Sequence, residues 1–456
     1  MAIGTQQTSQ TYTASDSSQN YRGPLAIVTT LFFMWGSLTS LNDVLIPFAQ
    51  NVFNIKLAAS MLIQTAFFSA YFLFSIPSAK IVDWLGYKRA MVVGLLTMAV
   101  ACAAFYPAAR IPSFPFFLAA LILLATGITI LQVAANPYVT ILGNPQTASS
   151  RLNLTQAFNS LGTAIFPWIG AHLILGTTTS AVAQTPAEQA DAVIKLYVYF
   201  FTVALVLLAL AITFLRLPSI EAAQHHIGEK LNDSLWNHPN LIFGAIAIFV
   251  YVGAEVAIGS SISNYLALDK IGHLVSETQV PNAADRYTVA LGQAAKYISL
   301  YWLGAMIGRF IGSAILQKVK TGTLLAICAV MAALLVTVSV LTNGHIAMWS
   351  ILLVGFFNSI MFPSIFTLGV AELGPLTGDG SGILIMSIVG GAIIPWVVGK
   401  VADLINSQYY PTMSRGQVSW GEGIHYALII PVICYLYILF FAMSGSKPNS
   451  VRRAKA

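Results

Sequence analysis

Long apolar runs separated by short polar stretches form the dominant pattern of this chain. Most runs reach the length of about 20 residues that a helix needs to cross a bilayer core. Such runs favour membrane helices over strands, because a strand edge would leave its backbone groups without partners in lipid. Twelve segments are predicted, at approximately 24–50, 59–82, 90–108, 114–142, 152–176, 195–215, 239–268, 288–317, 322–341, 345–371, 382–406 and 424–443.

The most polar long connection between segments, residues 216–238, divides the chain into halves of six segments. We therefore predict an all-α membrane protein with a six-helix bundle over 22–215, a cytoplasmic linker over 216–238 and a second six-helix bundle over 239–445. Residues 1–21, rich in Ser, Thr and Gln, are expected to form a disordered cytoplasmic tail, and residues 446–456 a second cytoplasmic tail.

The two halves resemble each other in sequence. Two motifs recur in matching order: 162–168 pairs with 390–396, and Gln132–Pro137 pairs with Asn358–Pro363. With six helices per half, both copies start on the same side of the membrane. The halves are therefore expected to be parallel repeats, with a substrate held between them near the middle of the bilayer.

Composition excludes a water-soluble fold. The chain is 57% hydrophobic and 8% charged, whereas a soluble domain carries roughly 25% charged residues. An excess of Lys and Arg over Asp and Glu gives the chain a net charge of +6. The Lys and Arg residues are more frequent on the side of the membrane shared by both termini, which predicts that both termini are cytoplasmic. This distribution does not suggest a nucleic-acid partner. We expect an integral protein of a bacterial inner membrane, in contact with lipid. Cys102, Cys328 and Cys434 lie in apolar runs and are expected to pack there, without disulfides or a metal site.

Two carboxylates interrupt apolar segments: Asp43 in the first and Glu255 in the seventh. An ionisable group inside a membrane helix is energetically costly and usually marks an ion pathway or a substrate site. Both are candidates for cation coupling, with a hydrogen bond to a neighbouring helix as the alternative for Asp43. Lys296 is a candidate partner for Glu255, and extension to the outer interface is its alternative. Arg309, near the inner end of its segment, is expected to make a structural loop contact.

The loop after the second segment contains Asp83, Gly86 and Lys88, followed by Arg89, with Ala79 four residues before Asp83. This spacing resembles the cytoplasmic signature of the major facilitator superfamily, in which a glycine stands at the position of Ala79. Gly86 permits a tight turn, and Asp83 can accept hydrogen bonds from a helix N-terminus or a basic partner. Lys88 and Arg89 hold the loop on the inner side. A plain positively charged turn is the alternative.

Four stretches, 41–43, 134–139, 151–160 and 251–255, resemble the fucose–galactose–glucose:cation symporter family. The resemblance covers roughly residues 22–445. It implies the major facilitator fold and cation-coupled sugar uptake, with Asp43 as the coupling carboxylate of the first helix.

Within that family, fucose-permease members carry glutamate at the position of Gln132 and glutamine at the position of Glu255. Glucose/galactose members look more like this chain at both positions. The resemblance therefore implies a hexose of the glucose or galactose type, and it places the fucose-type proton route through the fourth helix in doubt.

A sugar site needs amide and hydroxyl groups for the sugar hydroxyls and an aromatic platform for the apolar C–H faces. Polar side chains on helices from both halves can supply the hydrogen bonds, and an interhelical hydrogen bond is the alternative for each. The candidate sugar-binding residues are Asn42, Gln64, Gln132, Asn136, Gln156, Asn159, Asn264, Lys296 and Asn358. Trp35, Trp168, Trp302 and Trp396 are candidate stacking partners, with packing or interface anchoring as the alternative.

The resulting hypothesis is a secondary transporter, and not an enzyme, that imports a hexose together with H⁺ or Na⁺ by alternating access. The chain carries no Gly-x-x-x-x-Gly-Lys-Ser/Thr loop, which disfavours ATP-driven transport. We expect no cofactor other than the coupling ion, and we expect a monomer. An uncoupled hexose facilitator and an efflux pump for another small solute are the alternatives.

Overall fold

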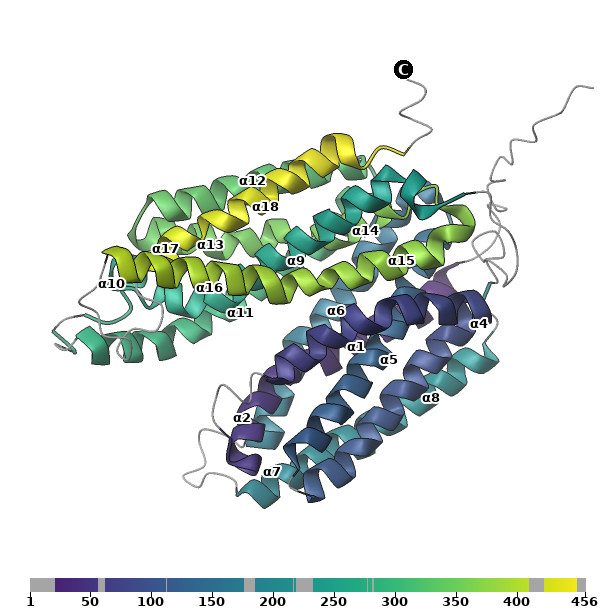
Figure 1. The fold of residues 1–456 in the computed structure, drawn as a ribbon, viewed down its shortest axis with the longest axis horizontal. Coiled ribbons are helices and arrows are strands. Elements are labelled where there is room, and N and C mark those ends of the chain that lie inside the picture. Colours follow the sequence, from purple (N-terminus) through teal and green to yellow (C-terminus); the bar gives the residue numbers. More distant parts are fainter. Residues whose placement is uncertain are drawn as a thin grey trace, which may run out of the picture.

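The structure, a computed structural model, describes residues 21–55, 62–111, 113–175, 185–215, 217–218, 233–276, 278–280, 283–409 and 422–448. These ranges are largely helical and contain no strand. Figure 1 shows the helices in two groups, the first half of the chain in purple to teal and the second in green to yellow. Most of the predicted N-terminal tail, linker and C-terminal tail lies outside the described residues, so the predicted domain limits stay a prediction.

The first half consists of helices that follow one another after short breaks, with π-helical turns at η2 and η3. In chain order they are α1 (Arg22–Ser40), α2 (Asn42–Phe53), α4 (Leu62–Arg110), α5 (Phe114–Ile141), η1 (Pro145–Thr147), α6 (Ala148–Gly170), η2 (Ala171–Leu175), α7 (Pro186–Val193), η3 (Ile194–Phe201) and α8 (Thr202–Phe214).

The second half has the same character and ends in a π-helical turn, η8. Its elements are η5 (Leu235–Asn237), α9 (Pro239–Leu266), α10 (Asp269–Gly272), α11 (Ala283–Ile315), α12 (Thr321–Leu341), α13 (Gly344–Asn358), α14 (Met361–Gly369), η6 (Gly374–Leu376), α15 (Thr377–Met386), η7 (Ser387–Val389), α16 (Gly390–Tyr409), α17 (Gly423–Ala427), α18 (Ile429–Phe440) and η8 (Phe441–Gly445).

Ten helical stretches of the described residues are long and apolar enough to cross a membrane. One of them, α4, contains two predicted segments, because Gly86 adopts a left-handed conformation (φ 74°, ψ 164°) that ends one helix and starts the next. Helix α6 is not among the ten, since residues such as Arg151 and Asn153 lower its hydropathy. These helices together account for the twelve predicted segments, and the predicted all-α membrane fold is confirmed.

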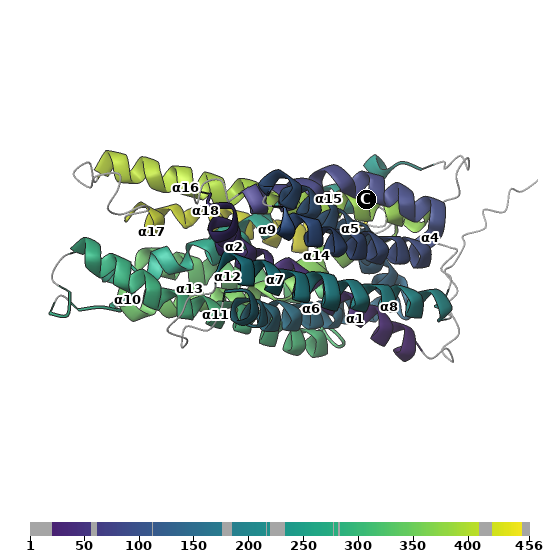
Figure 2. The ribbon, with the colours of Figure 1, turned by 90° about the horizontal axis from the view of Figure 1, so that it is seen from below.

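Hydrogen bonds join the two groups of helices. The Ser150 hydroxyl on α6 donates to the Ser313 carbonyl on α11 over 2.7 Å, and the Ser313 hydroxyl donates back to the Ser150 carbonyl over 3.0 Å. On the other side of the interface, α15 packs against α4 and α5. The helices of both groups run lengthwise in the view of Figure 2, whereas Figure 1 shows that the two groups are inclined to each other and diverge toward the left of that view.

The sequence repeat is reflected in equivalent backbone contacts. A Cβ atom at Gly162 of α6 would lie 2.6 Å from the carbonyl oxygen of Phe33 on α1. A Cβ atom at Gly390, at the start of α16, would overlap the carbonyl oxygen of Phe249 on α9. Small residues allow helix backbones to approach this closely in membranes. In each half, the first and fifth predicted segments therefore meet backbone to backbone.

Candidate functional site

Glu255 lies on α9, within the second half, and is only partly exposed. Tyr251, one turn earlier on the same helix, has its hydroxyl oxygen 2.7 Å from Oε1 of Glu255. The same hydroxyl lies 3.1 Å from the backbone carbonyl oxygen of Asn358, the last residue of α13. The carboxyl group thus has a protein partner, as a polar group withdrawn from water requires.

Helix α13 ends at Asn358 and α14 begins three residues later, so the tenth predicted segment is broken. The break follows from Pro363, which has no backbone N–H to offer the Ser359 carbonyl four residues earlier. Arg309 of α11 replaces that donor, with Nε 3.1 Å from the Ser359 carbonyl oxygen. The two adjacent carbonyls at the break therefore face Tyr251 and Arg309.

Arg309 also reaches the first half. Its Nη1 donates to the hydroxyl of Ser160 on α6, and Nδ2 of Asn153 on the same helix donates to the Arg309 carbonyl over 2.6 Å. The guanidinium interacts electrostatically with Glu255, although no ion pair within 4.0 Å joins these two described residues. The expected loop contact of Arg309 is therefore wrong, because the long side chain extends into the interface between the halves.

Each half contains a buried amide–tyrosine pair. In the first half, Nε2 of Gln132 donates to the Tyr71 hydroxyl over 2.8 Å. In the second, Nδ2 of Asn358 donates to the Tyr301 hydroxyl over 2.8 Å. The two amides hold matching places in the repeated motif, five residues before a proline. Gln132 and Asn358, both candidate sugar ligands, are thus each oriented by a buried tyrosine. These tyrosines, Tyr71 and Tyr301, are site residues that the sequence analysis did not single out.

The matching proline of the first half, Pro137, also frees a carbonyl. The residue four positions earlier is Val133, whose carbonyl accepts a hydrogen bond from the Ser381 hydroxyl of α15 over 3.0 Å. Each proline of the repeat is therefore associated with a side chain from a neighbouring helix. In the first half that side chain is neutral, whereas in the second half it is the charged Arg309.

The other polar candidates of the first half lie on α2, α5 and α6. Nε2 of Gln156 lies 3.4 Å from Oδ1 of Asn136, and Nδ2 of Asn159 donates to the Phe32 carbonyl over 3.0 Å. The Asn42 side chain is buried, and its Oδ1 has no hydrogen-bond partner among the described residues. The Ser160 hydroxyl, which contacts Arg309, bonds the Gln156 carbonyl over 3.2 Å. Gln156, and through it Asn136, therefore adjoins the contact between the halves.

Several candidates lie away from this group. Asn264 is nine residues beyond Glu255, about 13 Å along α9, and its Oδ1 accepts from the Tyr287 hydroxyl over 3.1 Å. Lys296 is exposed and lies about 20 Å before Arg309 along α11. It forms no ion pair with Glu255, and that expected pairing is wrong because the two residues lie at different depths.

Two further candidates cannot be placed in the same group. The backbone of Asp43 belongs to α2, but its side chain lies outside the described residues, so its coupling role stays a prediction. Gln64, at the start of α4, is partly exposed and has interaction partners of its own.

The tryptophans differ in their surroundings. Trp35 is buried and packs against Phe32, with ring centroids 4.0 Å apart. Trp168 and Trp396 are 71% and 63% exposed, and Trp302 is also exposed. Exposure on this scale favours interface anchoring over sugar stacking for Trp168 and Trp396.

The loop motif links the two halves at one end of the molecule. A Cβ atom on Gly378, in the first turn of α15, would lie 3.1 Å from Oδ1 of Asp83, so this carboxylate adjoins a helix N-terminus. Lys80 lies 3.4 Å from Asp83 and 2.8 Å from Asp379 of α15. Negative charge is favourable at a helix N-terminus. Asp83 thus lies beside a helix N-terminus and a basic side chain, and Lys80 adds a bridge between the halves.

The basic residues of the motif lie on the other side of the Gly86 turn. Nζ of Lys88 donates to the Thr213 carbonyl over 2.9 Å, at the end of α8. Terminal helix carbonyls commonly accept from lysine in this way. The Arg89 side chain is exposed.

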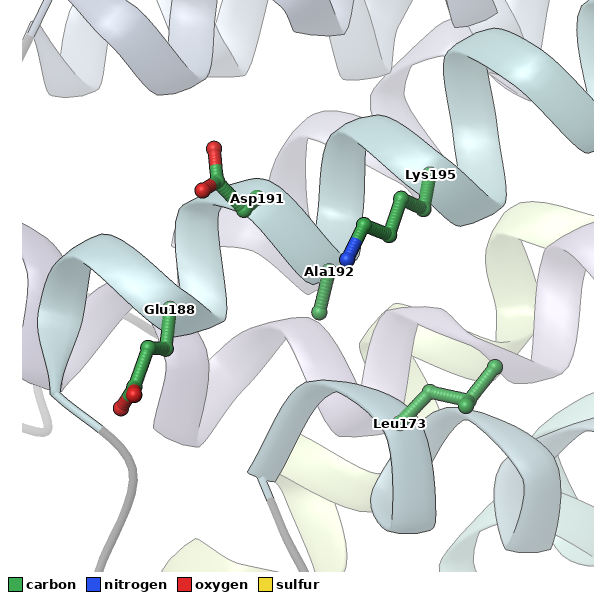
Figure 3. A pocket seen from close by; sticks show the side chains of 5 residues that line it. All are labelled: Leu173, Glu188, Asp191, Ala192 and Lys195. Atoms are coloured by element: carbon green, nitrogen blue, oxygen red, sulfur yellow. The ribbon is translucent and has the colours of Figure 1, made fainter.

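A hollow of about 330 Å³ lies between η2 and α7 and is lined by Leu173, Glu188, Asp191, Ala192 and Lys195 (Figure 3). Its two acidic groups already have partners: Asp191 pairs with Arg110 over 3.0 Å, and Glu188 caps α7 through Thr185. None of the candidate residues lines this hollow, so it is separate from the candidate site.

Two related groups of membrane helices, with polar side chains at their interface, define a multi-helix membrane transport protein. The chain matches the Major Facilitator Superfamily over residues 25–395, and it belongs to this family. It is 46% identical over 436 residues to a "Glucose/galactose transporter" of Brucella abortus, covering 96% of this chain and 97% of that protein. It is 32% identical to the "L-fucose-proton symporter" of Escherichia coli over 458 aligned positions, covering 96% and 97%.

Solved structures agree with this assignment. A crystal structure of a Major Facilitator Superfamily transporter, FucP, in the outward conformation matches with a TM-score of 0.77 and 28% identity, covering 94% of this chain and all of that one. The FucP protein is also described as the fucose:proton symporter of E. coli, in a second structure with a TM-score of 0.79, 29% identity and the same coverage. The predicted resemblance is confirmed, and the protein is an integral membrane transporter rather than an enzyme.

Proposed function

We propose that this protein imports a hexose of the glucose or galactose type in symport with a cation by alternating access. The observation that carries the proposal is the pair of equivalent buried amides, Gln132 and Asn358, one in each half, with the intramembrane acid Glu255 linked to Asn358 through the Tyr251 hydroxyl. Amides suit the hydroxyls of a sugar, and an acid within the membrane suits a cation. The names of the two relatives, a glucose/galactose transporter and a fucose–proton symporter, support the same substrate class.

In this proposal the sugar lies between the halves. Asn42, Gln132, Asn136, Gln156 and Asn159 supply polar groups from the first half, and Asn358 supplies an amide from the second. Asn264 and Lys296 lie farther along their helices and contribute along the path rather than at its centre, and Gln64 contributes from the start of α4.

Cation entry provides the driving force. One monovalent cation that crosses a potential of 100 mV releases about 2.3 kcal/mol. That free energy supports roughly 50-fold accumulation of the sugar, since about 1.4 kcal/mol corresponds to a factor of ten. Glu255 and Asp43 are the coupling carboxylates of the proposal.

We further propose a monomer in a bacterial inner membrane, with both termini in the cytoplasm and no cofactor other than the coupling ion. The end of the molecule that carries Lys88, Arg89 and Arg151 then faces the cytoplasm, as the positive-inside rule requires.

Counterflow and gradient-driven uptake in proteoliposomes test the proposal. Labelled glucose and galactose should exchange, and either an inward H⁺ gradient or an inward Na⁺ gradient should drive their accumulation. Absence of exchange with every hexose would contradict the proposal, and a clear preference for L-fucose would contradict the substrate choice. Exchange without any effect of either gradient would indicate an uncoupled facilitator. Gln132→Ala should weaken exchange, whereas Gln317→Ala, at an exposed position, is the matched control.

A further inference from the structure

The Tyr251 hydroxyl faces two acceptors but has only one proton to donate. Oε1 of Glu255 lies 2.7 Å away, and the Asn358 carbonyl oxygen lies 3.1 Å away. A backbone carbonyl can only accept. The contacts of this hydroxyl therefore depend on whether Glu255 itself carries a proton.

A protonated Glu255 satisfies every group. The carboxyl O–H donates to the Tyr251 oxygen, and the Tyr251 hydroxyl is then free to donate to the Asn358 carbonyl. An ionised Glu255 instead attracts the single phenolic proton, and the Asn358 carbonyl loses its donor. An unpaired buried acceptor costs about 1–3 kcal/mol, so the contact with Asn358 favours the protonated carboxyl.

Oε1 of Glu255 and the Tyr251 oxygen are 2.7 Å apart, which is the distance of an O–H···O hydrogen bond and leaves no room for a metal cation between the two atoms. Arg309 is an electrostatic neighbour of Glu255 and disfavours any added positive charge there, a proton as well as Na⁺. The titratable groups that interact with Glu255 are Tyr251 on its own helix, Arg309 and Tyr301 on α11, and Tyr435 on α18. Within the described residues, α13 to α16 add no titratable group to this set.

We propose that the coupling ion at Glu255 is a proton, and that the Tyr251–Asn358 contact conveys its presence to the break between α13 and α14. The inference rests on the proposed function and names its coupling ion. A proton from water on the outer side binds the carboxylate, and it later leaves the carboxyl for water on the inner side, while no other bond changes.

The consequences of proton loss extend to the other half. Ionised Glu255 withdraws Tyr251 from the Asn358 carbonyl and attracts the Arg309 guanidinium. That guanidinium holds the neighbouring Ser359 carbonyl and, in the first half, the Ser160 hydroxyl. Loss of the Glu255 proton therefore weakens the hydrogen bonds at the break in the tenth segment. It also weakens the contact between the halves.

Sugar-driven proton entry into proteoliposomes with a trapped pH dye tests the inference, alongside hexose counterflow, which needs no net ion movement. Glu255→Gln should reduce sugar-driven proton entry by roughly tenfold or more, because the intramembrane carboxyl is lost, and it should leave counterflow measurable. Tyr251→Phe should reduce proton entry less. Glu372→Gln and Tyr199→Phe, both at exposed positions, are the matched controls and should behave as the unmodified protein.

The opposite results are distinct from failure of the proposed function. Proton entry that survives Glu255→Gln but is lost in Asp43→Asn would move the proton site to Asp43 and overturn the inference, while the hexose function stands. Accumulation driven by Na⁺ alone, without proton movement, would also overturn only the inference. Absence of hexose exchange in the unmodified protein would overturn both.

Discussion

Nε of Arg309 donates a hydrogen bond to the Ser359 carbonyl over 3.1 Å, at the position where Pro363 leaves that carbonyl without its helical donor. The guanidinium fork lets the same side chain reach Ser160 in the other half. Lysine has the charge but not this planar fork.

We therefore expect Arg309→Lys to lower the free energy of unfolding by about 1–3 kcal/mol, the range for leaving a buried polar group unpaired. Thermal unfolding of the purified protein in detergent measures the effect. Arg110→Lys is the control, because its ion pair with Asp191 is exposed and such pairs contribute at most about 1 kcal/mol. Equal unfolding temperatures for both variants would contradict the role of Arg309.

Tyr71→Phe and Tyr301→Phe should have similar effects, because each removes the acceptor of one buried amide of the repeat. Each change is expected to cost about 1–3 kcal/mol of stability and to raise the KM for hexose, since the amide is no longer oriented. Thermal unfolding and concentration-dependent counterflow give the two quantities. Tyr199→Phe, at a 61% exposed position, should change neither. An effect in only one half would argue against equivalent roles.

Alanine at Gly162 or Gly390 should destabilise the protein, because the added Cβ meets a backbone carbonyl that cannot move aside. Overpacking of this kind costs typically about 1–3 kcal/mol. Gly23→Ala provides the control, since nothing lies within 4 Å of its added Cβ. Alanine is also the better helix former at that position. Unfolding temperatures that rise for Gly162→Ala would show that the helices separate at little cost.

The ion pair of Lys80 with Asp379 joins the halves but should contribute little to stability. The two side chains are 49% and 21% exposed, and a surface pair is worth at most about 1 kcal/mol. A double-mutant cycle with Lys80→Ala and Asp379→Ala should give a coupling energy in that range, and it should shrink at high salt. A coupling energy of several kcal/mol would contradict this expectation and show that the ion pair contributes strongly to holding the two halves together.

The membrane helices could be predicted because the length of an apolar run is a local property of the sequence. The break at Asn358 was harder to predict, although Pro363 marks the carbonyl that lacks a donor. What the sequence does not contain is the identity of the replacement donor. Arg309 lies 50 positions away in the chain, and only the packing of α11 against α13 brings it to Ser359.

Only part of the candidate site could be predicted, because the partner of a side chain, unlike its spacing to a proline, is not a local property of the sequence. The repeated spacing to proline singled out Gln132 and Asn358, but their partners Tyr71 and Tyr301 are two of 18 tyrosines and have no distinguishing pattern. Lys296 was matched with Glu255 by charge alone. The helical rise places it about 20 Å from Arg309 along α11, so opposite charge was an insufficient guide to contact.

The close glycine contacts at Gly162 and Gly390 also constrain how the protein can move. If one of two helices with touching backbones slid along the other, their main-chain atoms would collide. We therefore expect each such pair to move as one rigid body. The amides of α6 must then travel together with α1, and Glu255 on α9 must travel with α16. In the proposed alternating-access cycle we expect these helix pairs to tilt against each other, with the contact between α6 and α11 adjusting to the tilt.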